Sequence, residues 1–252
     1  MTFAAAVGPL VVYAATFQTI VFFLLPTRIR SGWAPVTIGL VGAGLTLTAG
    51  AVFGFETIGL GAPDPATVAV WALVSFVVVS GIGSTMLWSD RLRPALADPR
   101  IAGLGRRGAV FQIAFRIPIL TALIEEAFFR GVLHAALTAV YSTPVAFLVG
   151  AGLFGLWHLG PALEQSENHL GGNSTTAHVL ATIAVTTLAG FGFVALRIAT
   201  GSIWVPVVVH ALLNITMALF ARVAGGPRFA GLSRDNGEPV AAKQGSLQSC
   251  SG

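Results

Sequence analysis

Two adjacent glutamates, Glu125 and Glu126, stand in the middle of a strongly apolar segment, and Arg130 follows four residues after the second of them. An acid followed by a base four residues later is the favourable order for an ion pair on one helix. Since a helix turns by about 100° per residue, Glu125 points well away from Glu126. We therefore expect Glu126 to pair with Arg130 as a structural partner. Glu125 is then free to act on a water molecule or a metal ion.

A buried ion-pair network that holds helices together is the alternative interpretation of these charges. An ionisable side chain at the centre of a membrane helix costs roughly 3 kcal/mol or more, so such residues are functional candidates by default. Two carboxylates with a single arginine also leave a surplus negative charge, which a purely structural network should avoid. This surplus favours a chemical function.

Two further apolar segments carry polar residues at helical spacing. Phe154 precedes His158 by four residues, and His210 precedes Asn214 by four, so each pair lies on one face of a helix. Alone, each pair means little. A histidine near a membrane interface is often solvated or bonded to a carbonyl group, and an asparagine in an apolar helix often joins two helices by hydrogen bonding. With the glutamates, they form a candidate polar cluster inside a helix bundle.

The three motifs occur in a fixed order, Glu-Glu-x-x-x-Arg, Phe-x-x-x-His and His-x-x-x-Asn, each on its own apolar segment. This triple resembles the CPBP family, which comprises the CAAX prenyl proteases and bacteriocin-processing proteins and is also called the Abi family. The motifs are complete, and the resemblance covers roughly residues 110–222. It implies an intramembrane endopeptidase whose four polar side chains meet in a cavity open toward the cytoplasm. By motif position, the implied catalytic residues are Glu125, His158, His210 and Asn214, and the supporting residues are Glu126, Arg130 and Phe154.

The chemistry of these side chains agrees with that implication. Peptide hydrolysis needs an activated water and a donor to the oxyanion of the tetrahedral intermediate. Glu125 with His158 can hold and deprotonate the water, while His210 and Asn214 can donate to the oxyanion. A cysteine nucleophile is not expected, because the single cysteine, Cys250, lies in a polar tail.

A metal ion is the open point of this mechanism. Two histidines and a glutamate suit zinc, and in that case Glu125, His158 and His210 would be the ligands. The chain contains no His-Glu-x-x-His sequence of the zinc protease type. We expect a reaction without a cofactor, with zinc as the alternative.

The composition indicates whether these segments face water or lipid. Hydrophobic residues make up 55% of the 252 residues, charged residues only 10%, and the mean hydropathy is +0.82. Soluble domains carry about 25% charged residues, so most of this exterior must face lipid. The net charge of +4 indicates no nucleic-acid partner, because the arginines lie in short segments between helices rather than on one face.

A membrane helix needs about 20 apolar residues, and the sequence predicts an all-α, polytopic transmembrane bundle of about seven spans, with six or eight as alternatives. The fourth span can begin earlier than predicted, because 108–116 is also fairly apolar around Arg116. The spans are predicted at 5–26, 34–54, 66–88, 117–140, 144–160, 176–197 and 202–222.

The loops and composition predict an orientation and three regions. Arginines follow the first and third spans, acidic residues follow the second, and basic loops stay in the cytoplasm, so we expect the N-terminus outside the cell membrane and the C-terminus inside. Residues 1–107 form N-terminal transmembrane helices with a basic cytoplasmic loop. Residues 108–222 form the catalytic core, and 223–252, rich in Gly, Ser, Gln and charge, form a disordered polar tail.

The remaining histidines have ordinary interpretations. His134 lies one turn after Arg130 and is expected to be packed or interfacial, while His178 begins a span. His169 belongs to the polar segment 164–172, which we interpret as a solvated loop between spans. We assign none of the three a catalytic role.

The leading hypothesis is an intramembrane endopeptidase acting on a membrane-associated or prenylated-like peptide substrate, with membrane lipid as its other partner. The alternative is a non-catalytic membrane scaffold or bacteriocin-immunity protein with the same fold. An ion or proton transporter is disfavoured, because the first three spans offer almost no polar residues for a pathway. The sequence does not select a particular substrate.

Overall fold

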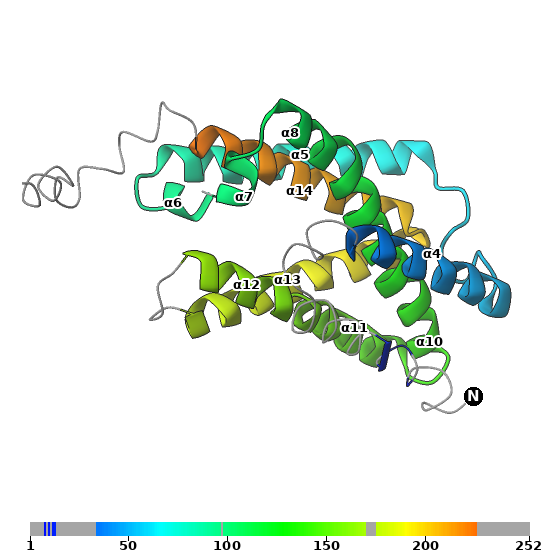
Figure 1. Cartoon of the computed structure of the whole chain (residues 1–252). Helices are drawn as coiled ribbons and strands as arrows, with labels where there is room; N and C mark the ends of the chain where they lie inside the picture. Colours follow the sequence, from blue (N-terminus) through cyan, green and yellow to red (C-terminus); the bar gives the residue numbers. More distant parts are fainter. Residues whose placement is uncertain are drawn as a thin grey trace, which may run out of the picture.

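The computed structural model describes residues 8, 10, 12, 13, 34–96, 98–169 and 175–225. Over these residues the chain is built from helices and connecting turns, with no strand, which confirms the predicted all-α class (Figure 1). Nearly all of the predicted first span, 5–26, and residues 226–252 of the predicted tail lie outside the described residues.

The described part begins with α4 (Ala34–Phe53) and α5 (Pro65–Trp88), followed by two short helices, α6 (Arg93–Leu96) and α7 (Pro99–Ala102). A continuous helix then runs from Arg106 to Thr138. Its consecutive segments are α8 (Arg106–Phe111), η2 (Gln112–Leu123), α9 (Ile124–Glu126), η3 (Ala127–Leu133) and α10 (His134–Thr138). The chain continues through α11 (Thr143–Trp157), α12 (Leu159–His169), α13 (Thr175–Thr200) and α14 (Trp204–Ala224).

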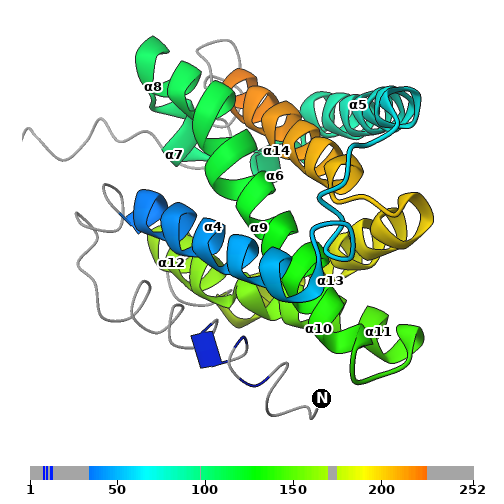
Figure 2. The ribbon, with the colours of Figure 1, turned by 90° about the vertical axis from the view of Figure 1, so that its right-hand side faces the viewer.

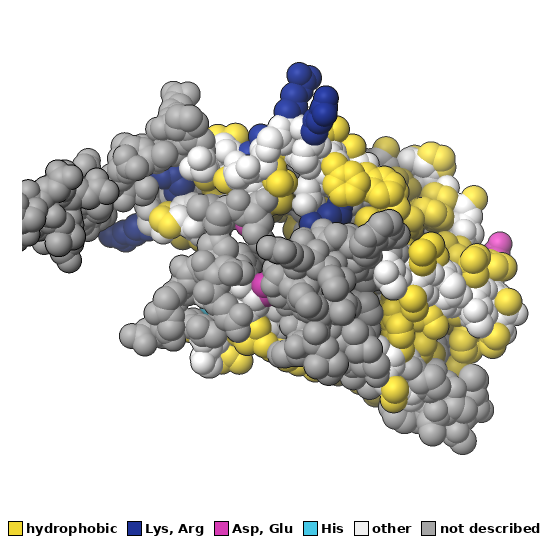
Figure 3. Space-filling view, in the orientation of Figure 1, with side chains coloured by type: hydrophobic (Ala, Val, Ile, Leu, Met, Phe, Trp, Pro, Cys, Tyr) yellow, Lys and Arg dark blue, Asp and Glu magenta, His cyan; other side chains and the backbone are white. Residues whose placement is uncertain are grey.

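Five helical stretches in the described residues are long and apolar enough to cross a membrane. They are Pro65–Trp88, Arg106–Thr138, Thr143–Ser166, Thr176–Thr200 and Trp204–Ala224, and Leu40–Phe53 is a shorter apolar helix. Large apolar side chains are exposed along these helices, for example Leu73 at 64% and Leu188 at 71%. Hydrophobic side chains cover much of the described surface, while basic side chains gather mainly at the end that carries α6, α7 and α8 (Figure 3). The protein is thus a polytopic membrane bundle, as predicted.

Two helix pairs are joined by the long helix 106–138. Helix α14 packs along α5, and α11 packs along α13. The long helix crosses from the first pair to the second, contacting α14 through η2 and α11 and α13 through η3, while α4 packs against its outer side (Figures 1 and 2). This crossing brings the middle of the long helix between α11, α13 and α14, where the three motifs meet.

The long helix is irregular around the glutamates. The segments η2 and η3 are π-helical, and the three-residue α9 that carries Glu125 and Glu126 lies between them. Pro118, which lacks an N–H group, lies within η2. π-Helical turns are rare and concentrate at functional sites. The helix begins at Arg106, earlier than the predicted 117, because the apolar residues around Arg116 extend it.

The polar segment after His158 is helical as far as His169, rather than the loop predicted for 164–172; residues 170–172 lie outside the described residues. Helix α12 continues to His169, packs on α13 and buries Gly160 and Ala162. It begins directly at His158, whose carbonyl accepts the N–H of Ala162 at 3.0 Å. The prediction was wrong because it followed polarity alone, whereas the small residues at the start of the segment provide a packing face.

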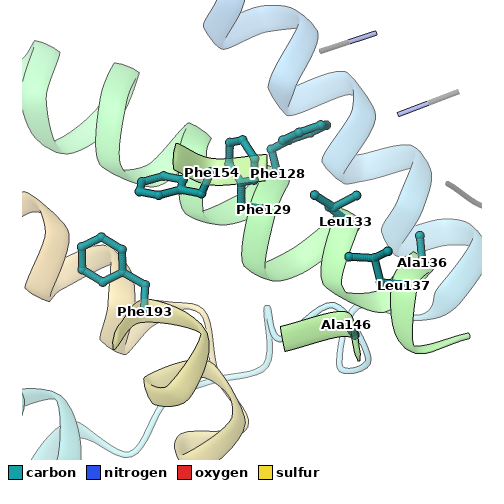
Figure 4. Packing of buried hydrophobic residues seen from close by; sticks show 8 residues of the cluster. All are labelled: Phe128, Phe129, Leu133, Ala136, Leu137, Ala146, Phe154 and Phe193. Carbon is teal, nitrogen blue, oxygen red and sulfur yellow. The ribbon is translucent and has the colours of Figure 1, made fainter. Parts of the chain in front are cut away.

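An aromatic and aliphatic cluster forms the core between the long helix, α11 and α13. Its buried members are Phe128, Phe129, Leu133, Ala136, Leu137, Ala146, Phe154 and Phe193 (Figure 4). Small residues bring α11 and α13 close together: a Cβ at Gly190 would lie 3.2 Å from the carbonyl oxygen of Ala151. Such close packing joins helices in lipid, where the hydrophobic effect does not.

Candidate active site

Glu126 is completely buried and joins the long helix to α14. Its Oε1 accepts a hydrogen bond from Arg130 Nη1 at 3.0 Å and a second from His210 Nδ1 at 2.8 Å. The expected ion pair between Glu126 and Arg130 is therefore present. Because the two donors converge on one oxygen, the first and third motifs are joined directly.

Arg130, also completely buried, lies among aromatic rings. Its Cζ is 4.0 Å from the ring centroid of Phe154 and 5.0 Å from that of Phe193, and its Nη2 donates to the carbonyl oxygen of Gly190 at 3.3 Å. A guanidinium over an aromatic face is stabilised by the ring quadrupole, most strongly where water is excluded. Phe154 of the second motif thus supports the first motif through its ring.

Glu125 takes a different direction from Glu126 and is 15% exposed. Its Oε1 accepts a hydrogen bond from the indole Nε1 of Trp157 at 3.3 Å. Its Oε2 is buried, lies 4.0 Å from His210 Nε2 and has no hydrogen-bond partner in the described part of the chain. One oxygen of Glu125 is therefore held while the other is available for chemistry.

The orientation of His210 is fixed from two sides. Its ring stacks on Phe193, with centroids 4.8 Å apart and planes 21° apart. Because the carboxylate of Glu126 only accepts hydrogen bonds, Nδ1 of His210 carries the proton in this contact. Nε2 is then the nitrogen that faces Glu125.

His158 lies at the turn between α11 and α12 and is half-buried. Its Nδ1 is 2.9 Å from the carbonyl oxygen of Phe154, so Nδ1–H donates a hydrogen bond to that oxygen, and Nε2 of the neutral ring can accept one. The ring of Phe154 lies against both histidines, 4.8 Å from His158 and 6.0 Å from His210 by centroid distance. Over the described residues His158 makes no direct ion pair with Glu125 or Glu126, and it joins the cluster through Phe154.

Asn214 lies one turn after His210 on α14 and is partly buried. It makes no hydrogen bond within the described ranges, so its side-chain amide is available on the helix face that also carries His210. Six of the seven predicted site residues are linked to one another by hydrogen bonds, ion pairs or ring contacts; Asn214 is the exception. Asn214 is linked by its position on the helix.

Several site residues carry no motif and were missed from the sequence. Gly190, Phe193 and Arg197 of α13 lie three and four residues apart, so they share one face directed at the long helix. Arg197 is buried and donates from Nε to the carbonyl oxygen of Arg130 at 3.2 Å and from Nη2 to that of Thr57 at 2.8 Å. The spacing of a glycine, an aromatic residue and an arginine in an apolar helix was the available signal.

The loop 54–61 packs against the long helix, α13 and the start of α14 at one end of the bundle. It is joined to α13 by the Arg197–Thr57 bond and to the start of α14 by the N–H of Ile203, which donates to the carbonyl of Gly59 at 2.9 Å. Gly59 has φ of +79°, a conformation that favours glycine. Any side chain there would also meet the guanidinium of Arg197.

The residues named as alternative zinc ligands, Glu125, His158 and His210, come from three different helical segments. Among the described side chains, no group of three or more His, Cys, Asp or Glu residues is arranged to hold a metal ion. Glu125 and His210 come within 4.0 Å of each other, but His158 does not complete a set with them. The three residues named as alternative ligands do not fit a zinc site in this arrangement.

Comparison with known proteins matches part of the chain to one family. Residues 107–216 match the family described as type II CAAX prenyl endopeptidase Rce1-like. This range contains all three motifs, and it confirms the resemblance inferred from them. No curated protein and no solved structure is significantly similar to the chain.

Proposed function

We propose, from the match of residues 107–216 to the family described as type II CAAX prenyl endopeptidase Rce1-like, that the protein is an intramembrane protease that cleaves a membrane-associated or prenylated-like substrate. One observation supports the proposal most. Glu125 is held by Trp157 through one oxygen, while its other oxygen has no partner in the described chain and lies beside a buried network of Glu126, Arg130 and His210. This is the arrangement that a general base needs.

The proposed reaction begins with a water molecule between Glu125 and His158. Oε2 of Glu125 accepts a proton from the water, and Nε2 of His158 accepts a hydrogen bond that orients it. The resulting hydroxide attacks the scissile carbonyl carbon, and the C=O π electrons move onto the oxygen to form the oxyanion. When this tetrahedral intermediate collapses, the C–N bond breaks and Glu125 gives its proton to the leaving amine nitrogen, which restores the carboxylate. Glu125 is preferred to Glu126 as the base. Oε2 of Glu126 also has no hydrogen-bond partner in the described residues, but the side chain of Glu126 has no exposed surface and its Oε1 already accepts two hydrogen bonds.

The oxyanion donors are proposed to come from α14. The Asn214 amide donates in its neutral form, whereas Nε2 of His210 donates only from a protonated ring, since Nδ1 already holds a proton toward Glu126. Such donors are worth most where water is excluded, typically 10²–10³-fold in rate for one group. The aromatic rings of Phe154 and Phe193 exclude water on this side.

The test is cleavage by the purified protein in lipid nanodiscs, using a panel of membrane-anchored and prenylated peptides. Glu125→Gln and His158→Ala should each lower cleavage by roughly 10²–10⁴-fold, the usual contribution of a general base. Glu56→Gln, which removes an exposed carboxylate in the loop 54–61, is the matched control and should cleave like the wild type. Unchanged cleavage in Glu125→Gln would refute the mechanism, and an intact bundle that cleaves none of the peptides would favour a scaffold.

Metal independence is proposed as a separate property of the reaction. A purified enzyme treated with a chelator should keep its activity, and metal analysis of the active protein should find less than one zinc ion per chain. Loss of activity on chelation that zinc restores would overturn this part and make Glu125, His158 and His210 candidates for ligands in a rearranged site.

A further inference from the structure

Trp157 is the last residue of α11 and directly precedes His158. Its indole N–H crosses to the long helix and donates to Oε1 of Glu125 at 3.3 Å. The end of α11 therefore positions both residues that are proposed to bind the water. His158 follows Trp157 directly, and Glu125 accepts the hydrogen bond from Trp157.

The indole ring is held by packing rather than by this hydrogen bond alone. It lies edge-on to Phe129, with centroids 5.7 Å apart and planes at 74°, and its centroid is 6.3 Å from that of Phe128. Both phenylalanines follow Glu125 within about one turn of the long helix. The donor and its acceptor are thus fixed to the same short stretch of backbone.

A glutamate side chain has three rotatable bonds, so a base without a second contact can place its carboxylate in several ways. The contact with Trp157 removes that freedom at Oε1. Oε2 is left buried, without a partner in the described residues, and 4.0 Å from His210 Nε2. The bond therefore selects which oxygen faces the reaction.

We propose that Trp157 is a positioning residue of this protease: its indole N–H holds Glu125 so that Oε2 is the oxygen that takes the proton from water. The inference rests on the proposed function. Trp157 lies at a variable position of the Phe-x-x-x-His motif, so the motif does not identify it. The proposal also assigns different roles to the two oxygens of the Glu125 carboxylate.

The kinetic test is Trp157→Phe, which keeps an aromatic ring against Phe128 and Phe129 but removes the N–H donor. We expect kcat to fall by about 10–100-fold, the cost of a small misplacement of a reacting group, while KM stays within about twofold. Trp88→Phe is the matched control, because Trp88 is 74% exposed at the end of α5. In Glu125→Gln, adding Trp157→Phe should cause no further loss, since Trp157 acts through Glu125.

The contact itself is tested without substrate by NMR of ¹⁵N-indole-labelled protein. The Trp157 signal is identified by its absence in Trp157→Phe and should shift in Glu125→Ala but not in Glu56→Ala. A wild type that cleaves nothing overturns the proposed function, and the positioning role with it. Cleavage that depends on Glu125 but is unchanged in Trp157→Phe overturns the positioning role alone. An unmoved indole signal also overturns it, because the contact is then absent.

Discussion

Removal of the Arg130 guanidinium by Arg130→Met tests the energetics of the buried network. The substitution leaves the carboxylate of Glu126, which has no exposed surface, with His210 as its remaining partner. Removing one partner of a buried ion pair costs about 3–5 kcal/mol, mostly because an uncompensated charge stays behind. The bond to the Gly190 carbonyl and the stacking on Phe154 are lost as well. We therefore expect a destabilisation at the upper end of that range.

The assay is reversible unfolding in mixed micelles with increasing SDS, followed by circular dichroism. Arg107→Met is the matched control, because Arg107 is exposed near the start of the same long helix, and substitutions at such surface positions usually change stability by about 0.5 kcal/mol or less. The double variant Glu126→Gln/Arg130→Met removes both charges and should be more stable than Arg130→Met alone. A cost below about 1 kcal/mol for Arg130→Met, or strict additivity in the double variant, would show that the buried charge is compensated in another way.

Three further predictions concern the oxyanion donor, a helix cap and the topology. Asn214→Ala should lower kcat by about 10²–10³-fold with little change in folding, and Asn214→Asp should not restore it, because an ionised carboxylate cannot donate; equal rates in all three proteins would remove Asn214 from the mechanism. At the start of α5 the hydrogen bonds from Thr67 to the exposed Asp64 hold the pKa of that carboxyl below its usual value. The stabilisation that this cap gives the folded protein is therefore present above about pH 4, the ordinary pKa of an aspartate, and is lost as the pH falls through the lowered pKa. In thermal unfolding, the wild type should be more stable than Asp64→Ala at neutral pH, and this difference should disappear on acidification. For the orientation, a membrane-impermeant maleimide should label Cys250 in lysed but not in intact cells, and labelling of intact cells would place the C-terminus outside.

Local spacing was enough to predict the parts of the site that belong to one helix. The ion pair of Glu126 with Arg130 follows from a spacing of four residues, and so does the shared face of His210 and Asn214. The apolar runs likewise marked the spans, because about 20 residues are needed to cross the bilayer in any membrane helix. These features depend on helix geometry and hydropathy, both of which the sequence contains directly.

Contacts between different helices could not be predicted from residue spacing or hydropathy. Whether His210 bonds to Glu125 or Glu126 depends on the rotation of α14 against the long helix, which is set by packing across the whole bundle. The roles of Trp157 and Arg197 depend equally on neighbours far apart in the sequence. The π-helical turns around α9 were also missed, because hydropathy does not distinguish them from ordinary helical turns.

The ion pair of Glu126 and Arg130 also bears on how the protein is assembled. Both residues belong to one helix, so their charges can compensate each other as soon as that helix enters the bilayer, before any neighbour is in place. The bonds to Gly190 and His210 become possible only when α13 and α14, which follow later in the chain, have inserted and associated. Glu126 and Arg130 can therefore enter the membrane as a neutral pair. Their other partners, Gly190 and His210, are synthesised later, when the helices associate and these bonds can form.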